Sequence, residues 1–238
     1  MIERSYKRDP DELRPIKFTR NFTKYAQGSV LVEFGETKVL VTAFIEEKTP
    51  KFLHDSNQGW ITAEYSMLPG ATQERTQRER FKVSGRTQEI QRLIGRAIRA
   101  AVDLEKLGER TITIDCDVIQ ADGGTRTASI NGAFIAVYDA LKSLKDNKVI
   151  QEIPIKEPIA AISVGIVDGY ELLDLDYKED SRADVDANAV LTASGDVIEF
   201  QLTSEGKPIS QITLMSLLQL ANQGIKNIIE MEQNKLDL

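Results

Sequence analysis

The chain has 238 residues, 41% of them hydrophobic, and its 37 acidic and 30 basic side chains give a formal net charge of −7. This length supplies enough apolar surface for one large domain or two small ones. A single cysteine, Cys116, excludes a disulfide framework and a cysteine-based zinc site, and a Ser-His-Asp triad would depend on His54 alone. The charged N-terminus predicts no signal peptide, and apolar stretches of about seven or eight residues are too short for a bilayer. We therefore expect a cytoplasmic protein with no membrane partner.

The first predicted elements form a β-hairpin. Residues 28–35 and 37–45 are β-rich runs on either side of a short Gly-Glu turn. Residues 46–82 contain Pro50, Gly59, Pro69 and Gly70 among many polar groups, which predicts mostly loop. A loop of this length inside a domain is often functional.

A long amphipathic helix is predicted over residues 87–107. Its apolar stripe has the three-and-four spacing of a helix face and comprises Ile90, Leu93, Ile94, Ala97, Ile98, Ala101 and Leu104. Gly108 stands where a C-cap glycine belongs. Arg92, Arg96 and Arg99 repeat the same spacing on another stripe, so they are expected to share one face.

The remaining elements alternate between strand and helix. A strand over 111–119 leads through Gly123-Gly124 to a helix over about 127–144. Then follow strands at 159–167 and 170–173, a hairpin of 189–192 with 197–203, and a helix at about 210–234 whose apolar side holds Ile212, Met215, Leu218, Ile225, Ile228 and Ile229. Hairpin, loop and helix thus occur twice, which predicts an α+β fold: one domain over 1–238 with a weak internal duplication, about 1–145 and 146–238.

The charge is unevenly distributed along the chain. Residues 71–100 hold eight basic and three acidic side chains, a local charge of +5, and seven of the eight cations are arginines. Residues 168–186 hold eight acidic and two basic side chains, a local charge of −6. The arginine fork suits phosphate, and aspartate oxygens suit Mg²⁺. On charge alone, two solvated faces of opposite sign are the commoner explanation.

The segment from Gln120 to Thr127 is a candidate anion cradle. Consecutive glycines at 123 and 124 allow backbone N–H groups to converge, and the following helix adds its unpaired N–H groups. Thr125 offers a hydroxyl and Arg126 a charged fork. The segment matches neither a Walker A loop nor a G-x-G-x-x-G motif. The alternative is a tight turn with Arg126 in solvent.

Two further clusters have related chemistry. Arg86 stands at the start of a predicted helix, where a cation is disfavoured unless an anion or a carboxylate such as Glu89 offsets it. Asp184 and Asp186 share one side of an extended segment, and Asp180 lies in the preceding turn. Such carboxylates can hold Mg²⁺ or act as a general acid; the alternative is an acidic surface turn.

Two long blocks, residues 84–96 and 115–130, closely resemble the bacterial ribonuclease PH family. Supporting blocks lie at 59–69, 107–112 and 172–181, and the resemblance runs nearly end to end. It implies mixed sheets packed on helices and a phosphorolytic 3′→5′ exoribonuclease, a nucleotidyltransferase that trims the 3′ ends of tRNA precursors and other RNAs. From this resemblance we expect inorganic phosphate as the co-substrate, a nucleoside diphosphate as the product, and a reversible reaction.

The resemblance also implies roles for individual residues. Phosphate is expected at Arg86, Gly124, Thr125 and Arg126. Asp180 and Asp186 are expected to bind Mg²⁺ and take part in catalysis. RNA guidance or subunit contacts are expected from Arg75, Arg78, Arg92, Arg96 and Arg99, in a homohexamer built as a trimer of dimers. Since phosphate itself is the nucleophile, no activated serine, cysteine or histidine is needed, which fits a chain with one histidine.

Some positions depart from the family pattern. Gly70 stands where relatives often have arginine, Leu202 and Ser204 interrupt a second block, and 209–211 alter a third. A catalytically silent RNA-binding scaffold is one alternative, but such a protein should lack the cradle or the acidic pair, and both are retained. A Mg²⁺-dependent nucleotide-binding hydrolase is another, and it would yield monophosphates without added phosphate.

Overall fold

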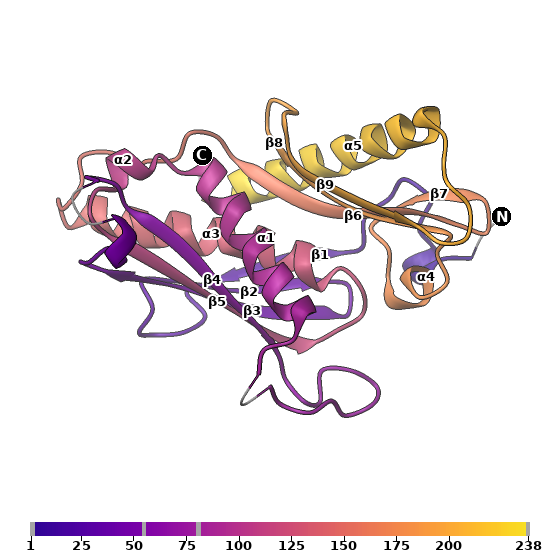
Figure 1. Cartoon of the computed structure of the whole chain (residues 1–238), viewed down its shortest axis with the longest axis horizontal. Coiled ribbons are helices and arrows are strands. Elements are labelled where there is room, and N and C mark those ends of the chain that lie inside the picture. The colour runs from indigo at the N-terminus through magenta and orange to yellow at the C-terminus, as the bar shows by residue number, and fades with distance from the viewer. Residues whose placement is uncertain (1–2, 54–55, 80–81, 237–238) are drawn as a thin grey trace.

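A computed structural model of the chain describes residues 3–53, 56–79 and 82–236. His54 lies outside these residues. Within them the strands form a five-stranded sheet of order β1-β2-β3-β5-β4 and a four-stranded sheet of order β7-β6-β8-β9, with helices packed on both (Figure 1). The predicted α+β class is confirmed.

The larger sheet is mostly antiparallel. Its strands are β1 (Ile16–Arg20), β2 (Gly28–Phe34), β3 (Thr37–Glu46), β4 (Trp60–Met67) and β5 (Thr111–Gln120). The predicted hairpin is confirmed by β2 and β3, whose alternate residues face the core. The prediction of loop was wrong over β4, which pairs in parallel with β5 and buries Ile61, Ala63 and Tyr65 on one face. That period-two pattern was present in the sequence, between segments rich in turn residues.

The predicted helix over 87–107 is in fact two helices, α1 (Gly85–Ala101) and α2 (Leu104–Leu107). Between them Val102 leaves helical geometry and forms an isolated bridge with Ile155, and the Asp103 side chain accepts hydrogen bonds from the first turn of α2. The predicted cap is confirmed, since Gly108 ends α2 with a φ of 69°. The apolar stripe of α1 is buried from Ile90 to Ala101.

The central helix is α3 (Thr125–Asp146), which packs against β2, β3 and β6. It is buried on nearly all sides. Gly132 leaves room for the larger sheet, since a Cβ there would lie 2.6 Å from a methyl group of Val32. On the other side, the Asn131 amide donates to the Ala161 carbonyl and accepts from the Ala161 N–H of β6. This helix therefore joins the two sheets into one core.

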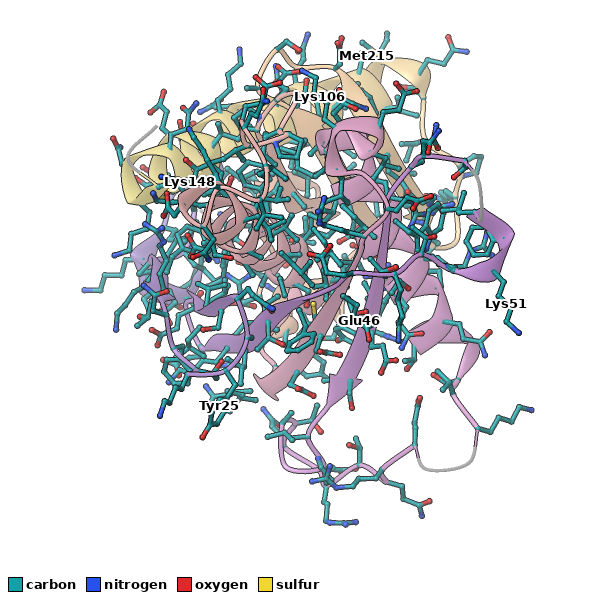
Figure 2. All side chains as sticks on the ribbon, turned by 90° about the vertical axis from the view of Figure 1, so that its left-hand side faces the viewer. Tyr25, Glu46, Lys51, Lys106, Lys148 and Met215 are labelled. Atoms are coloured by element: carbon teal, nitrogen blue, oxygen red, sulfur yellow. The ribbon has the colours of Figure 1, made fainter. Side chains whose placement is uncertain are left out.

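The second sheet contains β6 (Ile159–Val167), β7 (Tyr170–Leu173), β8 (Val185–Thr192) and β9 (Val197–Ser204), with the short α4 (Tyr177–Asp180) between β7 and β8. The last helix, α5 (Gln211–Leu236), packs on β6. Its predicted apolar side is wrong at the first turns, because Ile212 is 83% and Met215 51% exposed, and Figure 2 shows Met215 at the periphery. Further along the helix the predicted Ile225, Ile228 and Ile229 are buried in the core. The single-domain assignment and the internal duplication stay predictions.

Glu232 is a buried acid on the inner side of α5. Neither of its carboxylate oxygens has a hydrogen-bond partner within the part of the chain that the structure describes. Burial raises the pKa of Glu232 well above its usual value. The folded protein therefore binds this proton more tightly than the unfolded chain, and stability falls as pH rises above the ordinary glutamate range.

Replacing this acid by an apolar residue should stabilise the protein. Glu232→Met is expected to raise the free energy of unfolding at pH 8 by about 1–3 kcal/mol, because no unsatisfied buried carboxyl remains. Urea unfolding at pH 5 and pH 8 measures the effect, which should be larger at pH 8. Glu230→Met, at an exposed position two residues away, is the control and should change little. An unchanged or lower stability at pH 8 would contradict the prediction.

Candidate active site

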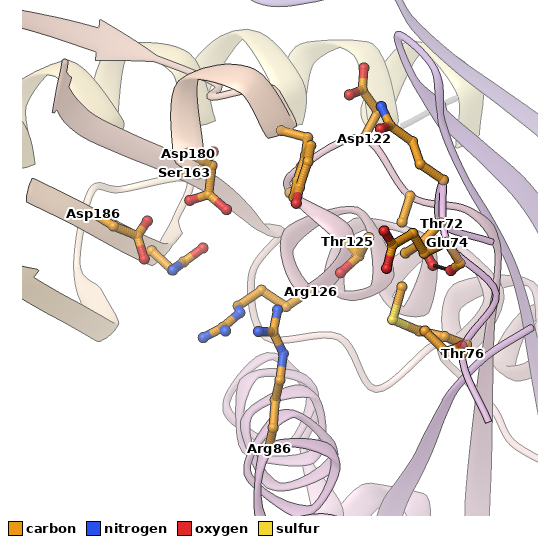
Figure 3. A pocket seen from close by; sticks show the side chains of 17 residues that line it. Thr72, Glu74, Thr76, Arg86, Asp122, Thr125, Arg126, Ser163, Asp180 and Asp186 are labelled. Atoms are coloured by element: carbon orange, nitrogen blue, oxygen red, sulfur yellow. Dashed lines mark hydrogen bonds between the residues drawn. The ribbon is translucent and has the colours of Figure 1, made fainter. Parts of the chain in front are cut away.

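A cavity of about 620 Å³ lies where the two sheets meet. It collects residues from α1, α3, α4, β6, β8 and the chain after β4, and Figure 3 shows their side chains. The lining includes all the residues for which phosphate or Mg²⁺ binding was predicted: Arg86, Gly124, Thr125, Arg126, Asp180 and Asp186. Segments separated by about 100 residues in sequence are thus brought to one site.

Residues 122–126, here called the glycine loop, form one wall. Gly123 and Gly124 have φ values of 76° and 65°, which side chains with a Cβ rarely adopt. Gly124 is the N-cap of α3, so Thr125 and Arg126 occupy its first turn. Thr37 holds the loop, accepting from the Asp122 N–H at 2.9 Å and donating to the Gly123 carbonyl at 2.6 Å. The first turn of a long helix leaves N–H groups for an anion.

Tyr65 contacts the cavity residue Thr125, and the sequence did not indicate this contact. It is buried on β4, and its hydroxyl lies 2.9 Å from Oγ1 of Thr125. Burial raises the pKa of the Tyr65 hydroxyl. A neutral hydroxyl at this position fixes the rotamer of Thr125. Its only sequence signal was the alternation of β4, which predicts burial and no role.

Two arginines enter the cavity from different helices. Arg86 lies in the first turn of α1, whose N-cap Ser84 accepts from the Thr87 N–H, and Arg126 lies in the first turn of α3. Figure 3 shows their guanidinium groups converging. Glu89 lies 3.6 Å from Arg126, whereas no ion pair of Arg86 occurs within the described residues. Two cations at two helix N-termini make this point strongly attractive to an anion.

The carboxylates stand beside the arginines. Asp180 ends α4, and Asp186 lies on β8. Burial raises the pKa of both, and that of Asp186 reaches about 6 because the charge on Asp180 adds to the effect while Arg126 and Arg86 oppose it. Asp184, expected to converge with this pair, is exposed and does not line the cavity. Within the described residues no group of three or more His, Cys, Asp or Glu side chains has metal-binding geometry.

Comparison with known proteins decides the family. Residues 12–142 match domain 1 and residues 157–224 match domain 2 of the 3′ exoribonuclease family. The chain belongs to this family. It is 53% identical over 237 residues to a protein named Ribonuclease PH from Syntrophomonas wolfei subsp. wolfei, and the match covers 99% of both chains.

The fold is also found in solved structures of lower sequence identity. A chain of the Archaeoglobus fulgidus exosome with RNA bound to the active site has a TM-score of 0.81 at 23% identity, covering 96% of this chain and 92% of that one. Rice Rrp46 has a TM-score of 0.80 at 20% identity, covering 98% and 100%. The family and the fold predicted from the sequence blocks are confirmed.

The arginines predicted to guide RNA or form subunit contacts lie outside the cavity in this exoribonuclease chain. Arg75 and Arg78 are exposed on the segment after β4, next to the cavity-lining residues Glu74 and Thr76. Arg92 and Arg96 are exposed on α1, where Arg96 donates to Glu199 of β9 at 2.8 Å. These four lie at the surface.

Arg99 is different because it packs against the protein. Its guanidinium carbon lies 4.4 Å from the Trp60 ring centroid, and Nη1 donates to the Ile61 carbonyl at 2.7 Å. These contacts tie α1 to β4, and they leave Arg99 only partly accessible. A Cβ built on Gly70 would meet no atom within 4 Å, so the backbone there leaves room for a side chain to begin.

A buried ion-pair network lies behind the cavity, and sequence reasoning missed it. Arg4 and Arg8 contact Glu179, and Arg14 contacts Asp174. All five side chains are at most 4% exposed. They connect the N-terminal segment with the turn that carries Asp180.

No helix in the described part of the chain is long and apolar enough to cross a bilayer.

Proposed function

We propose that this cavity is the site at which inorganic phosphate attacks the 3′-terminal phosphodiester of RNA. The chain is a phosphorolytic 3′→5′ exoribonuclease of the ribonuclease PH type, a nucleotidyltransferase that processes tRNA 3′ ends. The observation that supports this site most directly is the convergence of Arg86 and Arg126 from two helix N-termini beside Asp180 and Asp186. Phosphate is the co-substrate, and a nucleoside diphosphate is the product.

Each part of the cavity has a separate task in this proposal. A phosphate anion must approach an anionic phosphodiester, so Arg86, Arg126 and the first turn of α3 reduce the repulsion between them. Thr125, held by Tyr65, adds a hydroxyl to the phosphate contacts. A new P–O bond then forms as the bond to the departing 3′ oxygen breaks. That oxygen needs a proton or a cation. Asp180 or Asp186 would donate the proton when protonated, or the two carboxylates would hold the cation beside it.

The paired carboxylates also fit Mg²⁺. Each has a pKa raised by burial, and the two repel one another, so a divalent cation would relieve an unfavourable charge. Mg²⁺ commonly takes one or two protein carboxylates and fills its other positions with water and phosphate oxygens. We propose Asp180 and Asp186 as its ligands. When bound there, the ion would neutralise charge on the phosphates.

Mg²⁺ affinity should therefore depend on pH. The carboxylates must lose their protons to bind the ion, and the pKa of Asp186 is about 6. We expect affinity to weaken by about tenfold per pH unit below this value and to level off above pH 7. Calorimetric titration of the RNA-free protein with MgCl₂ at pH 5, 6 and 8 measures it. An affinity that is independent of pH, or that survives in Asp186→Asn, would exclude Asp186 as a ligand.

RNA is proposed to reach the cavity along the arginine-bearing surface. Arg75 and Arg78 adjoin its rim, and Arg92 and Arg96 continue the positive surface along α1. Arg99 is proposed to contribute mainly by holding α1 in place. A homohexamer, built as a trimer of dimers, would repeat this surface around a ring. The proposed location of the enzyme is the cytoplasm.

Product identity tests the function. With RNA, Mg²⁺ and phosphate, the protein is expected to release nucleoside diphosphates, and adding excess diphosphate should extend the RNA instead. Omitting phosphate should stop the release. Monophosphates formed without phosphate would indicate the hydrolase, and RNA binding with no product under either condition would indicate the silent scaffold.

A further inference from the structure

Arg14 occupies an unusual place between two walls of the cavity. It is 1% exposed and lies just before β1. One edge of its guanidinium binds Asp174, with Nη2 at 2.7 Å from Oδ1 and Nε at 3.0 Å from Oδ2. The backbone N–H of Arg14 also donates to this carboxylate at 2.8 Å. Burial alone would raise the pKa of Asp174, but this pairing outweighs it and keeps the pKa below its usual value.

The other edge of Arg14 touches the glycine loop. Nη1 donates to the Asp122 carbonyl at 2.7 Å. A Cβ built on Gly124 would lie 2.9 Å from Nη2, so the loop backbone rests directly against the guanidinium. One planar group therefore binds a carboxylate on one side and the glycine loop on the other.

The residues on the far side of this contact carry a cavity carboxylate. Residues 174–180, here called the aspartate turn, run from the partner of Arg14 to Asp180. Their helical part is fixed by a capping box between Asp176 and Glu179, and Arg4 donates to Glu179 at 2.7 Å. The aspartate turn is thus rigid, and its position depends on how its ends are held.

The glycine loop and the aspartate turn also touch directly. A Cβ on Gly123 would lie 2.6 Å from the Asp176 carbonyl carbon and 2.8 Å from the Tyr177 nitrogen. The two backbones are therefore in van der Waals contact where the loop has its positive φ. Arg14 binds both segments behind this contact, so a shift of one is transmitted to the other.

We propose that Arg14 is a positioning residue that sets the separation between the phosphate-binding glycine loop and Asp180. The inference rests on the proposed function of the cavity, since it concerns how that site is held. Arg14 does not line the cavity and touches no substrate in this proposal. Errors of about 1 Å in such a separation can cost on the order of 10²-fold in rate.

Two conservative variants test the proposal. Arg14→Lys keeps the charge but has no fork to reach both Asp174 and the Asp122 carbonyl. Asp174→Asn keeps the shape and removes the charge that orients the fork. Both are expected to raise the KM for phosphate by about tenfold or more and to lower kcat. The matched controls are Arg20→Lys and Asp139→Asn, which alter another Arg–Asp ion pair, between β1 and α3, outside the cavity lining.

The kinetic readout separates positioning from a purely structural role. A structural defect reduces the number of active molecules and leaves the KM for phosphate unchanged, as expected for the two controls. Folded Arg14→Lys and Asp174→Asn proteins with the parent KM would overturn the proposal. So would failure of both variants to fold, since the ion pair would then be a folding requirement. The parent is assayed first: a parent that releases no nucleoside diphosphate refutes the proposed function itself.

Discussion

Arg126→Ala is expected to lower the rate of phosphorolysis by about 10²–10³-fold, the usual cost of removing one preorganised donor from a developing anion. Arg126 lies in the first turn of α3 and enters the cavity beside Arg86. Its ion pair within the described residues is a long contact to Glu89 at 3.6 Å, so the fold should tolerate the loss. The measurement is the rate of nucleoside diphosphate release as a function of phosphate concentration.

Two comparisons make this result specific. Arg126→Lys should retain part of the activity, because lysine keeps the positive charge. It should not retain all of it, because lysine lacks the two parallel N–H donors of the guanidinium group. Arg182→Ala removes a half-exposed arginine whose ion pair is with Asp168 on the surface, and it should leave the rate unchanged. The kcat/KM for RNA extension from nucleoside diphosphate must fall by the same factor as the kcat/KM for phosphorolysis, since an enzyme cannot shift the equilibrium. An Arg126→Ala protein with the parent rate would remove this residue from the site.

Three of the six residues predicted to bind phosphate or Mg²⁺ are adjacent in sequence, and local patterns are enough to predict them. Gly124, Thr125 and Arg126 follow one another at a strand-to-helix junction, where glycine and a helix start already indicate an anion site. The hairpin of β2 and β3 could be predicted equally well, since alternate residues of the two paired strands are apolar and point to the same buried face of the sheet. Patterns of this kind depend only on neighbouring residues, so the sequence alone is sufficient to predict the local structure.

Contacts between distant segments could not be predicted in the same way. Arg14 and Asp174 are 160 positions apart, and neither has a pattern that indicates the other. Tyr65 resembles any buried residue of an alternating strand until Thr125 is placed next to it. Asp184 shows the reverse error: the alternation rule put it with Asp186, but the strand begins at Val185 and Asp184 lies outside it, at the surface.

Asp186→Asn should lower activity and raise stability together. The pKa of Asp186 in the folded protein is about 6, against an ordinary 3.8, so the folded state binds its proton more tightly than the unfolded chain does. Stability at this residue is therefore lost as pH rises between these values and stays lost above pH 6. Asparagine carries no charge, so the free energy of unfolding at pH 8 without Mg²⁺ should rise by about 1–3 kcal/mol.

The same substitution removes a proposed metal ligand and a proton carrier, so the rate should fall by on the order of 10² or more. Urea unfolding at pH 5 and pH 8 should show the larger gain in stability at the higher pH. Asp184→Asn, two residues away and outside the cavity, is the control and should change neither quantity. An active Asp186→Asn protein, or one with unchanged stability at pH 8, would contradict the assignment. A gain in stability coupled to a loss of rate would indicate that the protein holds this carboxylate in an unfavourable place because the reaction requires it there.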